Sequence, residues 1–332
     1  MKVILKTHAR LYRHLRIFVN PLLSLVLIMK KRILPRNFLL TAFCFFSFHF
    51  PLFSQNNILV FQSDFGLKDG AVSAMKGVAM GVSPELKLYD VTHEIPAYNI
   101  WEAAYRLVQT APYWPNGTVF VSVVDPGVGT NRKSVVLLTK SGHYFVTPDN
   151  GTLTLVAEQL GIQELREIDE ANNRRKNSGE SYTFHGRDVY AFTAAKLASK
   201  GISFEQVGPK LPEKVVSIPY QKPSFSNGKV KGGIPVLDIQ YGNVWTNINK
   251  EVFNKMGIKV GDNIKVLVYK NDKKVFEGTV KYVNTFGDVK EGENVGYFNS
   301  LLNFSVGINM GSFSEKYKVF SGSEWAIELS KN

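Results

Sequence analysis

The sequence predicts an α/β domain followed by a smaller all-β domain of barrel or sandwich type. Two observations lead to this fold class. Between residues 57 and 203, short apolar runs alternate with segments of helical periodicity, which is typical of layered α/β domains. Between residues 234 and 328, short alternating segments are broken by Gly, Asn and Asp, which favours a small domain made of strands.

The first half of the α/β domain alternates strands with helices. A strand is predicted at residues 58–62, and a helix follows at 71–82, where apolar residues recur at helical spacing and Asp69 is placed to cap the start. A second strand at 86–91 and a second helix at 100–110 repeat the pattern. This order indicates a sheet that is covered by helices.

The second half of this domain adds three strands and a helix. Residues 119–124 are all apolar or small, as in a strand that is buried on both faces. Residues 135–138 and 144–146 are short strands separated by a Lys-Ser-Gly turn, so we expect a hairpin. A last helix is predicted over 188–200, with Gly201 at its end.

Composition divides the chain into four parts. Residues 1–54 form a leader, and residues 55–206 form the α/β domain with the site described below. Residues 207–233 are rich in Pro, Gly, Ser and Lys and are interpreted as an interdomain linker. Residues 234–332 form the β domain, in which strands are predicted at 264–269, 274–280 and 325–329.

The positive charge of the chain is concentrated in the leader. Residues 1–54 contain nine Lys or Arg and no Asp or Glu, so removing these nine from the formal net charge of +12 leaves +3 for the rest. A nucleic-acid-binding protein carries its basic surface on the folded domain. The charge distribution therefore argues against a nucleic-acid partner.

The leader has the features of a secretory signal. Translation could start at Met29, because residues 30–32 are basic and residues 38–53 are an apolar, Phe-rich stretch of signal-peptide length. Cleavage after Ser54 would export the protein to the periplasm or the extracellular space. The alternative is an uncleaved N-terminus that anchors the protein in a membrane. Cys44 is the only cysteine and lies in this leader, so the processed protein needs no disulfide.

Three segments that follow predicted strands or precede a helix combine Asp, His and Gly. They are SDFGLKDG at 63–70, DPGVGTNR at 125–132 and TFHGRD at 183–188. Ligands bind at the carboxyl ends of strands in open α/β sheets. Taken one at a time, these residues have ordinary structural explanations: a turn or a helix cap for the aspartates, a solvated loop charge for the arginine, and a hydrogen-bonded structural histidine.

The order of several motifs along the chain is more specific than any one of them. These motifs are SDFG, DVTHEIP at 90–96, VVDPGVGTNR at 123–132, PDNG at 148–151, TFHGRDVYAFTAA at 183–195, DIQYGNVWTNI at 238–248 and NSLLNFSVGIN at 299–309. The series resembles the S-adenosyl-L-methionine (SAM) hydroxide adenosyltransferase family, the branch of the chlorinase and fluorinase superfamily that uses hydroxide instead of halide. The resemblance extends from residue 58 to residue 328.

The resemblance implies hydrolysis of SAM to adenosine and L-methionine, by in-line attack of water or hydroxide at ribose C5′. SAM is the substrate, and no cofactor or metal is expected. In the family an Asp, an Arg and a His position and activate the water, and they fall on Asp125, Arg132 and His185. Asp125 is then the proton acceptor, Arg132 stabilises negative charge, and His185 either orients the water or relays its proton. The sequence leaves the path of the proton open.

The same positions distinguish the branches of the superfamily. In the halogenases the Asp and His are replaced, typically by Tyr, and a Ser that contacts halide follows the His position. This chain has Asp125, His185 and Gly186 and therefore resembles the hydrolytic branch. A halogenase is the less favoured alternative.

The resemblance also implies substrate contacts in both domains. Asp64 would bind the ribose hydroxyls, because a carboxylate accepts two hydrogen bonds. Asp69 and Asp238 would face the methionine part, where a carboxylate can pair with the ammonium group. Phe184 and Gly186, on either side of the His, are assigned to the substrate as well.

The adenine contacts implied by the resemblance lie in the β domain. Asn243 would read the adenine edge, and Trp245 would stack on the ring opposite Phe286. Ser300 would contact the carboxylate of the substrate, but the segment departs from the family here, because Leu301 and Leu302 stand where a small Gly is often found. Since these contacts come from both domains, the ligand should bridge them, and the resemblance implies that the bridge is between neighbouring subunits of a homotrimer.

Two further function classes stay open. The leader motivates an exported protein that binds a nucleoside or SAM without turnover, since SAM is an intracellular metabolite. A metal hydrolase is less favoured, because residues 55–332 contain only His93, His143 and His185 and no HExxH-like spacing.

Overall fold

The computed structural model describes residues 56–332. The leader at 1–54, with Met29, Cys44 and the predicted signal or anchor, lies outside the described residues. Within the described part, none of the helices has both the length and the apolar character that crossing a membrane requires.

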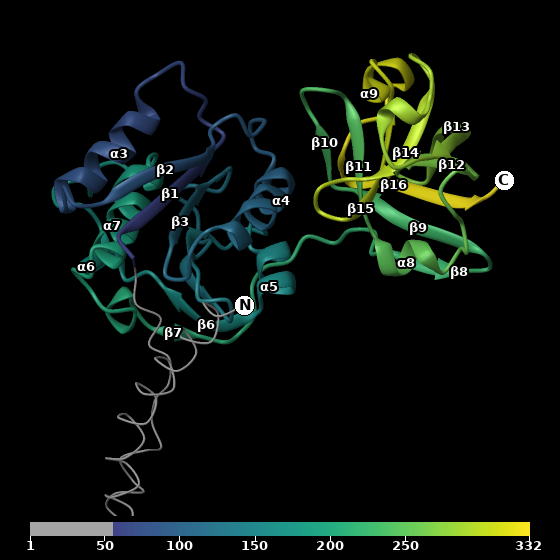
Figure 1. The fold of residues 1–332 in the computed structure, drawn as a ribbon. Helices are drawn as coiled ribbons and strands as arrows, with labels where there is room; N and C mark the ends of the chain where they lie inside the picture. The colour runs from purple at the N-terminus through teal and green to yellow at the C-terminus, as the bar shows by residue number, and fades with distance from the viewer. Residues whose placement is uncertain (1–55) are drawn as a thin grey trace, which may run out of the picture. The chain divides into compact units, whose positions relative to one another are not determined.

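The first domain is built on one seven-stranded sheet with the order β2-β1-β3-β5-β4-β6-β7 (Figure 1). One part of the sheet is parallel: β1 pairs with β2 and with β3, and β3 pairs with β5. The other part is antiparallel: β4 pairs with β5 and with β6, and β6 pairs with β7. The strands are β1 (Ile58–Ser63), β2 (Lys87–Thr92), β3 (Val119–Val123), β4 (Ser134–Thr139), β5 (Tyr144–Pro148), β6 (Ile162–Glu167) and β7 (Lys210–Leu211).

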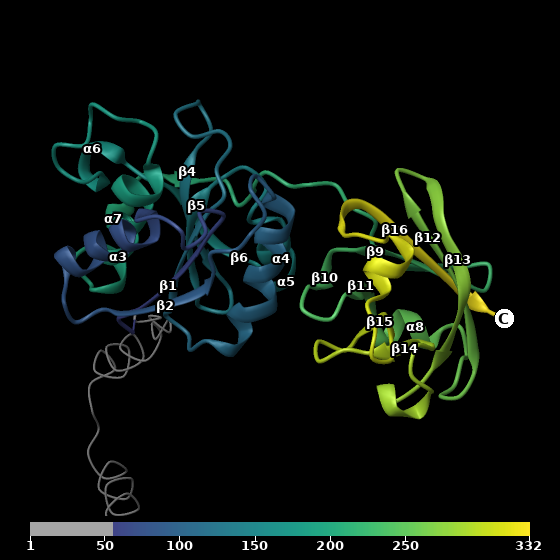
Figure 2. The same ribbon diagram turned by 90° about the horizontal axis from the view of Figure 1, so that it is seen from above.

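Helices cover both faces of this sheet, as Figure 2 shows, with α3 and α7 on one side and α4 and α5 on the other. The two apolar cores confirm the layering, because Met75 and Tyr190 belong to one buried cluster and Leu107 and Phe120 to another. The helices are α3 (Ala71–Val82), α4 (Ile100–Thr110), α5 (Thr154–Leu160), α6 (Glu170–Asn173), a π-helix (Gly186–Ala191) and α7 (Phe192–Ala198), with 3₁₀ turns at Ala111–Tyr113 and Glu205–Val207.

Local sequence signals explain most of this domain. The helix predicted at 100–110 is confirmed, and the Asn99 side chain caps it by accepting the Glu102 amide. Every residue of β3 is buried, as its continuous apolar pattern predicts. The helix predicted over 188–200 differs, because it begins with the π-helix at Gly186 and ends at Ala198. Helix α6 and strand β6 have no clear periodicity and were not predicted.

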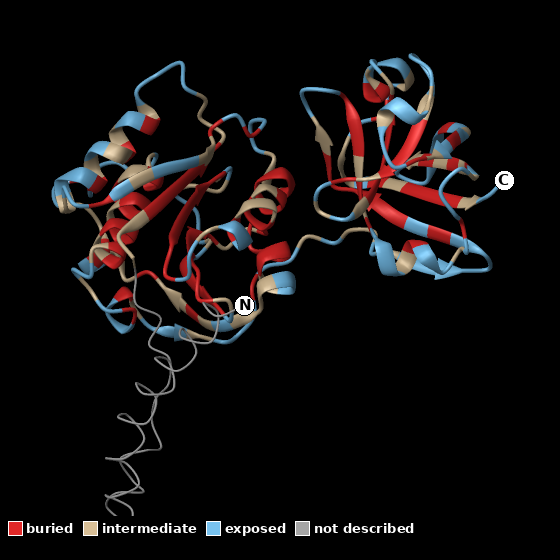
Figure 3. Ribbon diagram, viewed as in Figure 1, coloured by how far each residue is buried: buried red, intermediate tan, exposed pale blue. Residues whose placement is uncertain are grey.

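The second domain is rich in strands, with a nine-stranded sheet in the order β10-β11-β15-β14-β13-β12-β16-β9-β8. Figure 3 shows that buried residues follow the strands of both sheets. The strands are β8 (Ser224–Ser226), β9 (Lys229–Ile234), β10 (Val236–Asp238), β11 (Asn243–Asn249), β12 (Asn263–Lys270), β13 (Lys273–Tyr282), β14 (Asn294–Phe298), β15 (Asn303–Ile308) and β16 (Gly322–Lys331). Two short helices, α8 (Lys250–Asn254) and α9 (Phe313–Tyr317), and a 3₁₀ turn (Phe286–Asp288) accompany them.

The segment predicted as a linker, 207–233, contains short strands as well as irregular structure. It contains β7, which extends the first sheet, and β8 with most of β9, which belong to the second. The longest stretch of the segment without helix or strand is 212–223. Composition misses these strands because their partners are remote: β7 pairs with β6, and β9 pairs with β16 near the end of the chain.

Candidate active site

Two strand ends and the start of a helix meet around one cavity of the α/β domain. Parallel strands β1 and β3 end side by side, and the π-helix packs against β3, where a Cβ on Gly186 would lie 3.1 Å from Val123 Cγ1. The cavity has a volume of about 280 Å³ and is lined by Asp64, Phe65, Ala97, Tyr98, Val123, Asp125, Val128, Thr183, Phe184, His185 and Gly186. This edge of the sheet is where α/β proteins bind ligands.

Asp125 follows β3 and is held by Arg132 in a two-pronged ion pair. Arg132 Nε donates to both carboxylate oxygens at 3.0 and 3.1 Å, and Nη2 donates to Oδ2 at 2.6 Å. The side chain of Asp125 is only 5% exposed, and that of Arg132 is 11% exposed. Burial works against the guanidinium cation, but the hydrogen bonds and the charge of Asp125 raise the pKa of Arg132. The carboxylate therefore has a fixed direction.

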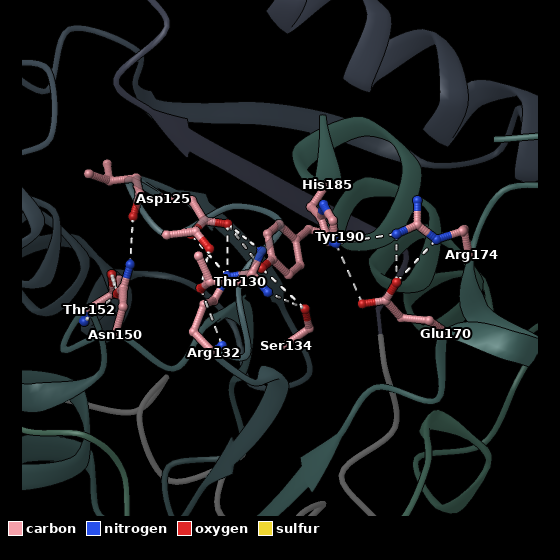
Figure 4. A network of polar contacts seen from close by, with 12 residues as sticks. Asp125, Thr130, Arg132, Ser134, Asn150, Thr152, Glu170, Arg174, His185 and Tyr190 are labelled. Carbon is pink, nitrogen blue, oxygen red and sulfur yellow. Dashed lines mark hydrogen bonds and ion pairs between the residues drawn. The ribbon is translucent and has the colours of Figure 1, made fainter. Parts of the chain in front are cut away.

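Two further residues, which the sequence analysis missed, complete this network (Figure 4). The Tyr190 hydroxyl lies 3.4 Å from Asp125 Oδ2 and 3.3 Å from Ser134 Oγ, and Ser134 accepts a hydrogen bond from Arg132 Nη1. Burial, followed by the charge of Asp125, raises the pKa of Tyr190, so its hydroxyl remains a donor. The contacts thus form a closed ring of four side chains, which are those of Asp125, Arg132, Ser134 and Tyr190.

The π-helix is what brings Tyr190 to this site. Tyr190 follows His185 by five residues. In an α-helix this spacing turns the two side chains to different sides, whereas in a π-turn it keeps them on the same side. The two rings lie on the same side, with centroids 6.4 Å apart. A π-turn leaves no regular periodicity in the sequence, which is why a tyrosine in TFHGRDVYAFTAA gave no signal of its own.

His185 lies at the start of the π-helix and is 4% exposed. Its Nε2 is 3.2 Å from Arg174 Nη2 and 3.6 Å from Glu170 Oε1, while its Nδ1 is buried without a partner among the described residues. Burial, followed by the charges of Arg132 and Arg174, lowers the pKa of His185 and outweighs the opposite influence of Glu170 and Asp125. The imidazole is therefore neutral at neutral pH.

Asp64 and Asp69, both in the SDFGLKDG motif, have different positions. Asp64 lines the cavity, and its Oδ2 accepts the Tyr98 amide at 2.9 Å. Asp69 is exposed just before α3, where its Oδ1 accepts the Ala71 amide at 2.9 Å, but the N-cap residue is Gly70 and not Asp69 as predicted. It does not line the cavity in the described part of the chain.

A series of polar contacts, buried at Ser63 and His93, supports the turn that carries Asp64. Ser63 Oγ is 2.7 Å from His93 Nδ1, and His93 Nε2 is 3.1 Å from Asp90 Oδ1. The His93 carbonyl also accepts the amide of Gly66, whose φ of 66° suits glycine. This series gives the DVTHEIP motif, for which the sequence analysis proposed no role, a positioning one.

The predicted adenine and methionine contacts of the β domain line a second cavity of about 750 Å³. Asn243 Nδ2 donates to Asp238 Oδ2 at 3.2 Å, and Asn243 Oδ1 is buried without a partner among the described residues. A Cβ on Gly307 would lie 2.3 Å from that oxygen, so the glycine leaves its edge open. The ring of Phe286 packs on Tyr297, a residue the sequence analysis missed, at 4.7 Å. Trp245 and Ser300 also line this cavity.

The predicted site residues other than Asp69, which lines neither cavity, therefore fall into two groups. Asp64, Asp125, Phe184, His185 and Gly186 line the cavity of the α/β domain, where Arg132 fixes Asp125. Five others line the cavity of the β domain: Asp238, Asn243, Trp245, Phe286 and Ser300. No residue is common to the two linings. Chemically, the first cavity offers a carboxylate that can accept a proton beside a neutral imidazole, and the second offers aromatic rings with an amide edge.

Comparisons with known proteins agree with this division. A sequence model described as the SAM hydroxide adenosyltransferase N-terminal domain matches residues 59–208, and that of the C-terminal domain matches residues 232–326. The chain is 35% identical over 266 residues to an (R)-S-adenosyl-L-methionine hydrolase of Methanocaldococcus jannaschii, covering 78% of this chain and 87% of the relative. It is 28% identical over 290 residues to a fluorinase of Actinopolyspora mzabensis, covering 80% and 95%.

A solved structure of a conserved protein from Thermotoga maritima superposes with a TM-score of 0.74 and 37% sequence identity, covering 82% of this chain and all of that one. The matched regions include both groups of cavity residues described above. The chain thus belongs to the SAM hydroxide adenosyltransferase family.

Proposed function

We propose that this protein hydrolyses SAM to adenosine and L-methionine. The observation that carries the proposal is the Asp125 carboxylate, which Arg132 fixes at a cavity that it shares with His185. The hydrolase relatives support the same reaction. Among the superfamily's reactions, a carboxylate suits hydrolysis, because attacking water must lose a proton and attacking halide does not.

In the proposed reaction, a water oxygen attacks ribose C5′ as the bond from C5′ to sulfur breaks. The electron pair of that bond stays on sulfur, so the sulfonium leaves as the neutral thioether of methionine and needs no acid. The water proton passes to Asp125. Arg132 holds the carboxylate in line with the attack, and Asp64 binds the ribose hydroxyls. The reaction needs no cofactor.

The proposed substrate is the (R) epimer at the sulfonium centre, since the relatives named as hydrolases carry that epimer in their names. Two epimers place the methionine chain in different directions from the ribose. A site that requires in-line geometry at C5′ separates them by how well the leaving sulfur is aligned.

The deciding experiment follows adenosine and methionine by chromatography after the protein is incubated with each purified SAM epimer in ¹⁸O-labelled water. We expect both products, faster from the (R) epimer, with ¹⁸O in the 5′-hydroxyl of adenosine. Binding without product would favour the exported binding protein instead. A 5′-halogenated product that forms only with added halide would favour a halogenase.

We also propose a homotrimer whose site joins the α/β cavity of one subunit to the β-domain cavity of the next. The α/β cavity alone, at about 280 Å³, is slightly smaller than the usual range of about 300–1,000 Å³ for ligand sites. Both linings also include exposed apolar side chains: Tyr98 is 73% exposed, Ile239 68%, Tyr241 67% and Met310 82%. Such side chains mark surfaces that a partner covers.

Mixing two inactive variants tests the shared site. Asp125→Asn disables the first cavity and Trp245→Ala the second, so each homo-oligomer should be inactive. If subunits share sites, co-expression should restore activity in about a quarter of the sites, since random mixing pairs intact halves that often. No recovery, although mass spectrometry detects mixed oligomers, would contradict the shared site.

We propose that the protein is exported, supported by the basic and apolar pattern of residues 29–53. Fractionation of the native host followed by mass spectrometry of the mature N-terminus tests this. An N-terminus near residue 55 outside the cytoplasm agrees with export, an intact leader in the membrane fraction indicates an anchor, and recovery in the cytoplasm contradicts both.

A further inference from the structure

An ion pair outside the predicted site contacts His185. Arg174 donates from Nε and Nη2 to Glu170 Oε2, at 3.1 and 2.6 Å, and the same Nη2 lies 3.2 Å from His185 Nε2. In Figure 4 Arg174 and Glu170 lie on one side of His185, and Asp125 and Arg132 lie on the other. Neither residue of the pair belongs to a motif that the sequence analysis singled out.

The contact with Arg174 restricts where His185 carries its proton. A guanidinium has only donors and stays protonated, so the nitrogen that faces it must accept. The competing partner, Glu170 Oε1, is at 3.6 Å, which is beyond hydrogen-bonding distance. His185 Nε2 is therefore the acceptor, and in a neutral imidazole the proton then resides on Nδ1.

The rest of the fold holds Arg174 in this position. Its guanidinium lies 5.0 Å above the Tyr182 ring, and its side chain is 11% exposed. Helix α6 is anchored at Asn173, whose Nδ2 donates to the Gln206 and Val207 carbonyls and whose own carbonyl accepts the Thr193 hydroxyl. Arg174 therefore approaches His185 from an anchored segment rather than from a free loop.

We propose that Arg174 and Glu170 are positioning residues that keep His185 as the Nδ1–H tautomer, so that His185 donates to the attacking water and Asp125 alone takes its proton. The proposal rests on the proposed hydrolysis. It assigns the separate roles of His185 and Asp125 in the proton transfer, which the sequence leaves open. The two carry opposite charges: Arg174 provides the contact to Nε2, and Glu170 aims Arg174.

The geometry of His185 and Asp125 agrees with this division. Both line the same cavity, and His185 Nδ1 is buried with no hydrogen-bond partner among the described residues. The proposal gives this nitrogen a partner, the attacking water. An N–H that donates to the water oxygen turns the water hydrogens away, toward an acceptor such as Asp125. The bond from oxygen to C5′ then forms as one O–H bond breaks, and the proton goes to the carboxylate.

The charges around His185 give a prediction for pH dependence. Facing the ring are Asp125 and Arg132 from the loop after β3, Glu170 from α6, and Arg174 from the residue after it. Tyr182 from the segment before the π-helix and Tyr190 from the π-helix also face it. Arg174 lowers the pKa of His185, and Glu170 raises it. Protonated His185 would place an N–H against Arg174, so activity should fall as pH decreases through the pKa of His185.

Two substitutions should therefore move the acidic limb of the kcat profile in opposite directions. Arg174→Gln removes the cation and should shift the limb to higher pH. Glu170→Gln removes the carboxylate and should shift it to lower pH, while Arg174→Lys, which keeps the charge, should stay near the wild type. Arg175→Gln is the matched control, since Arg175 is the next residue along the chain, pairs with Asp188 of the π-helix and makes no hydrogen bond to His185.

A measurement without substrate separates this proposal from the proposed hydrolysis. Nitrogen-15 and carbon-13 NMR of the full chain reports the tautomer of each histidine, and the spectrum of His185→Gln assigns His185. We expect the Nδ1–H tautomer in the wild type and in Arg175→Gln, and its loss in Arg174→Gln. An Nε2–H tautomer in the wild type overturns the proposal whether or not SAM is hydrolysed, and so do acidic limbs that move together or not at all.

Discussion

Replacing Asp125 by asparagine should lower kcat by about 10²–10⁴-fold, the range expected when a general base is lost. The affinity for SAM should change little, because the carboxylate acts mainly as the water loses its proton. Asparagine keeps an oxygen that can accept from Arg132, so the buried guanidinium is not left without a partner. Stopped assays for kcat and isothermal titration for Kd separate the two quantities.

The matched control for Asp125→Asn is Glu167→Gln. Glu167 also forms an ion pair, with Lys133, but its side chain is 34% exposed and it does not line the cavity. Its replacement should leave both kcat and Kd close to the wild-type values. If Asp125→Asn instead weakened SAM binding and left kcat unchanged, Asp125 would be a binding residue and the proposed base would be wrong.

Replacing Arg132 by methionine should lower the free energy of unfolding by about 3–5 kcal/mol, because it leaves a buried carboxylate without its counter-charge. Arg132 and Asp125 are 11% and 5% exposed, so water replaces little of the lost interaction. Arg132→Lys keeps the charge and loses the two-pronged geometry, so it should lose less. Urea denaturation of the three proteins, with a common m value, measures these differences.

Lys222→Met provides the control for an exposed ion pair. Lys222 pairs with Glu158, and their side chains are 58% and 37% exposed, so this change should cost only about 0–1 kcal/mol. In the double variant Asp125→Asn with Arg132→Met, the loss should be smaller than the sum of the two single losses, because neither buried charge remains unpaired. A loss for Arg132→Met as small as that for Lys222→Met would contradict the buried pair.

The order of elements in the α/β domain could be predicted because each element has its own pattern. Strand β3 is continuously apolar, and helix α4 carries both its periodicity and its Asn99 cap within twelve residues. The strands inside the predicted linker have no such local pattern. Strands β7 and β9 form because they pair with strands that are distant in the sequence. The local sequence, rich in Pro, Gly and Lys, indicates only that no long helix forms there.

The sequence by itself determined the family resemblance and the residue types of the site, because Asp125, Arg132 and His185 lie in motifs at the ends of predicted elements. The sheet then brings the ends of its parallel strands to one edge. Only the tertiary structure decided which groups surround these residues. Tyr190 reaches Asp125 through a π-turn, and Arg174 reaches His185 from the end of the anchored α6. Periodicity in the sequence indicates which side of a helix or strand is buried. These contacts depend instead on how separate segments pack, and we expect that packing to set which nitrogen of His185 carries the proton.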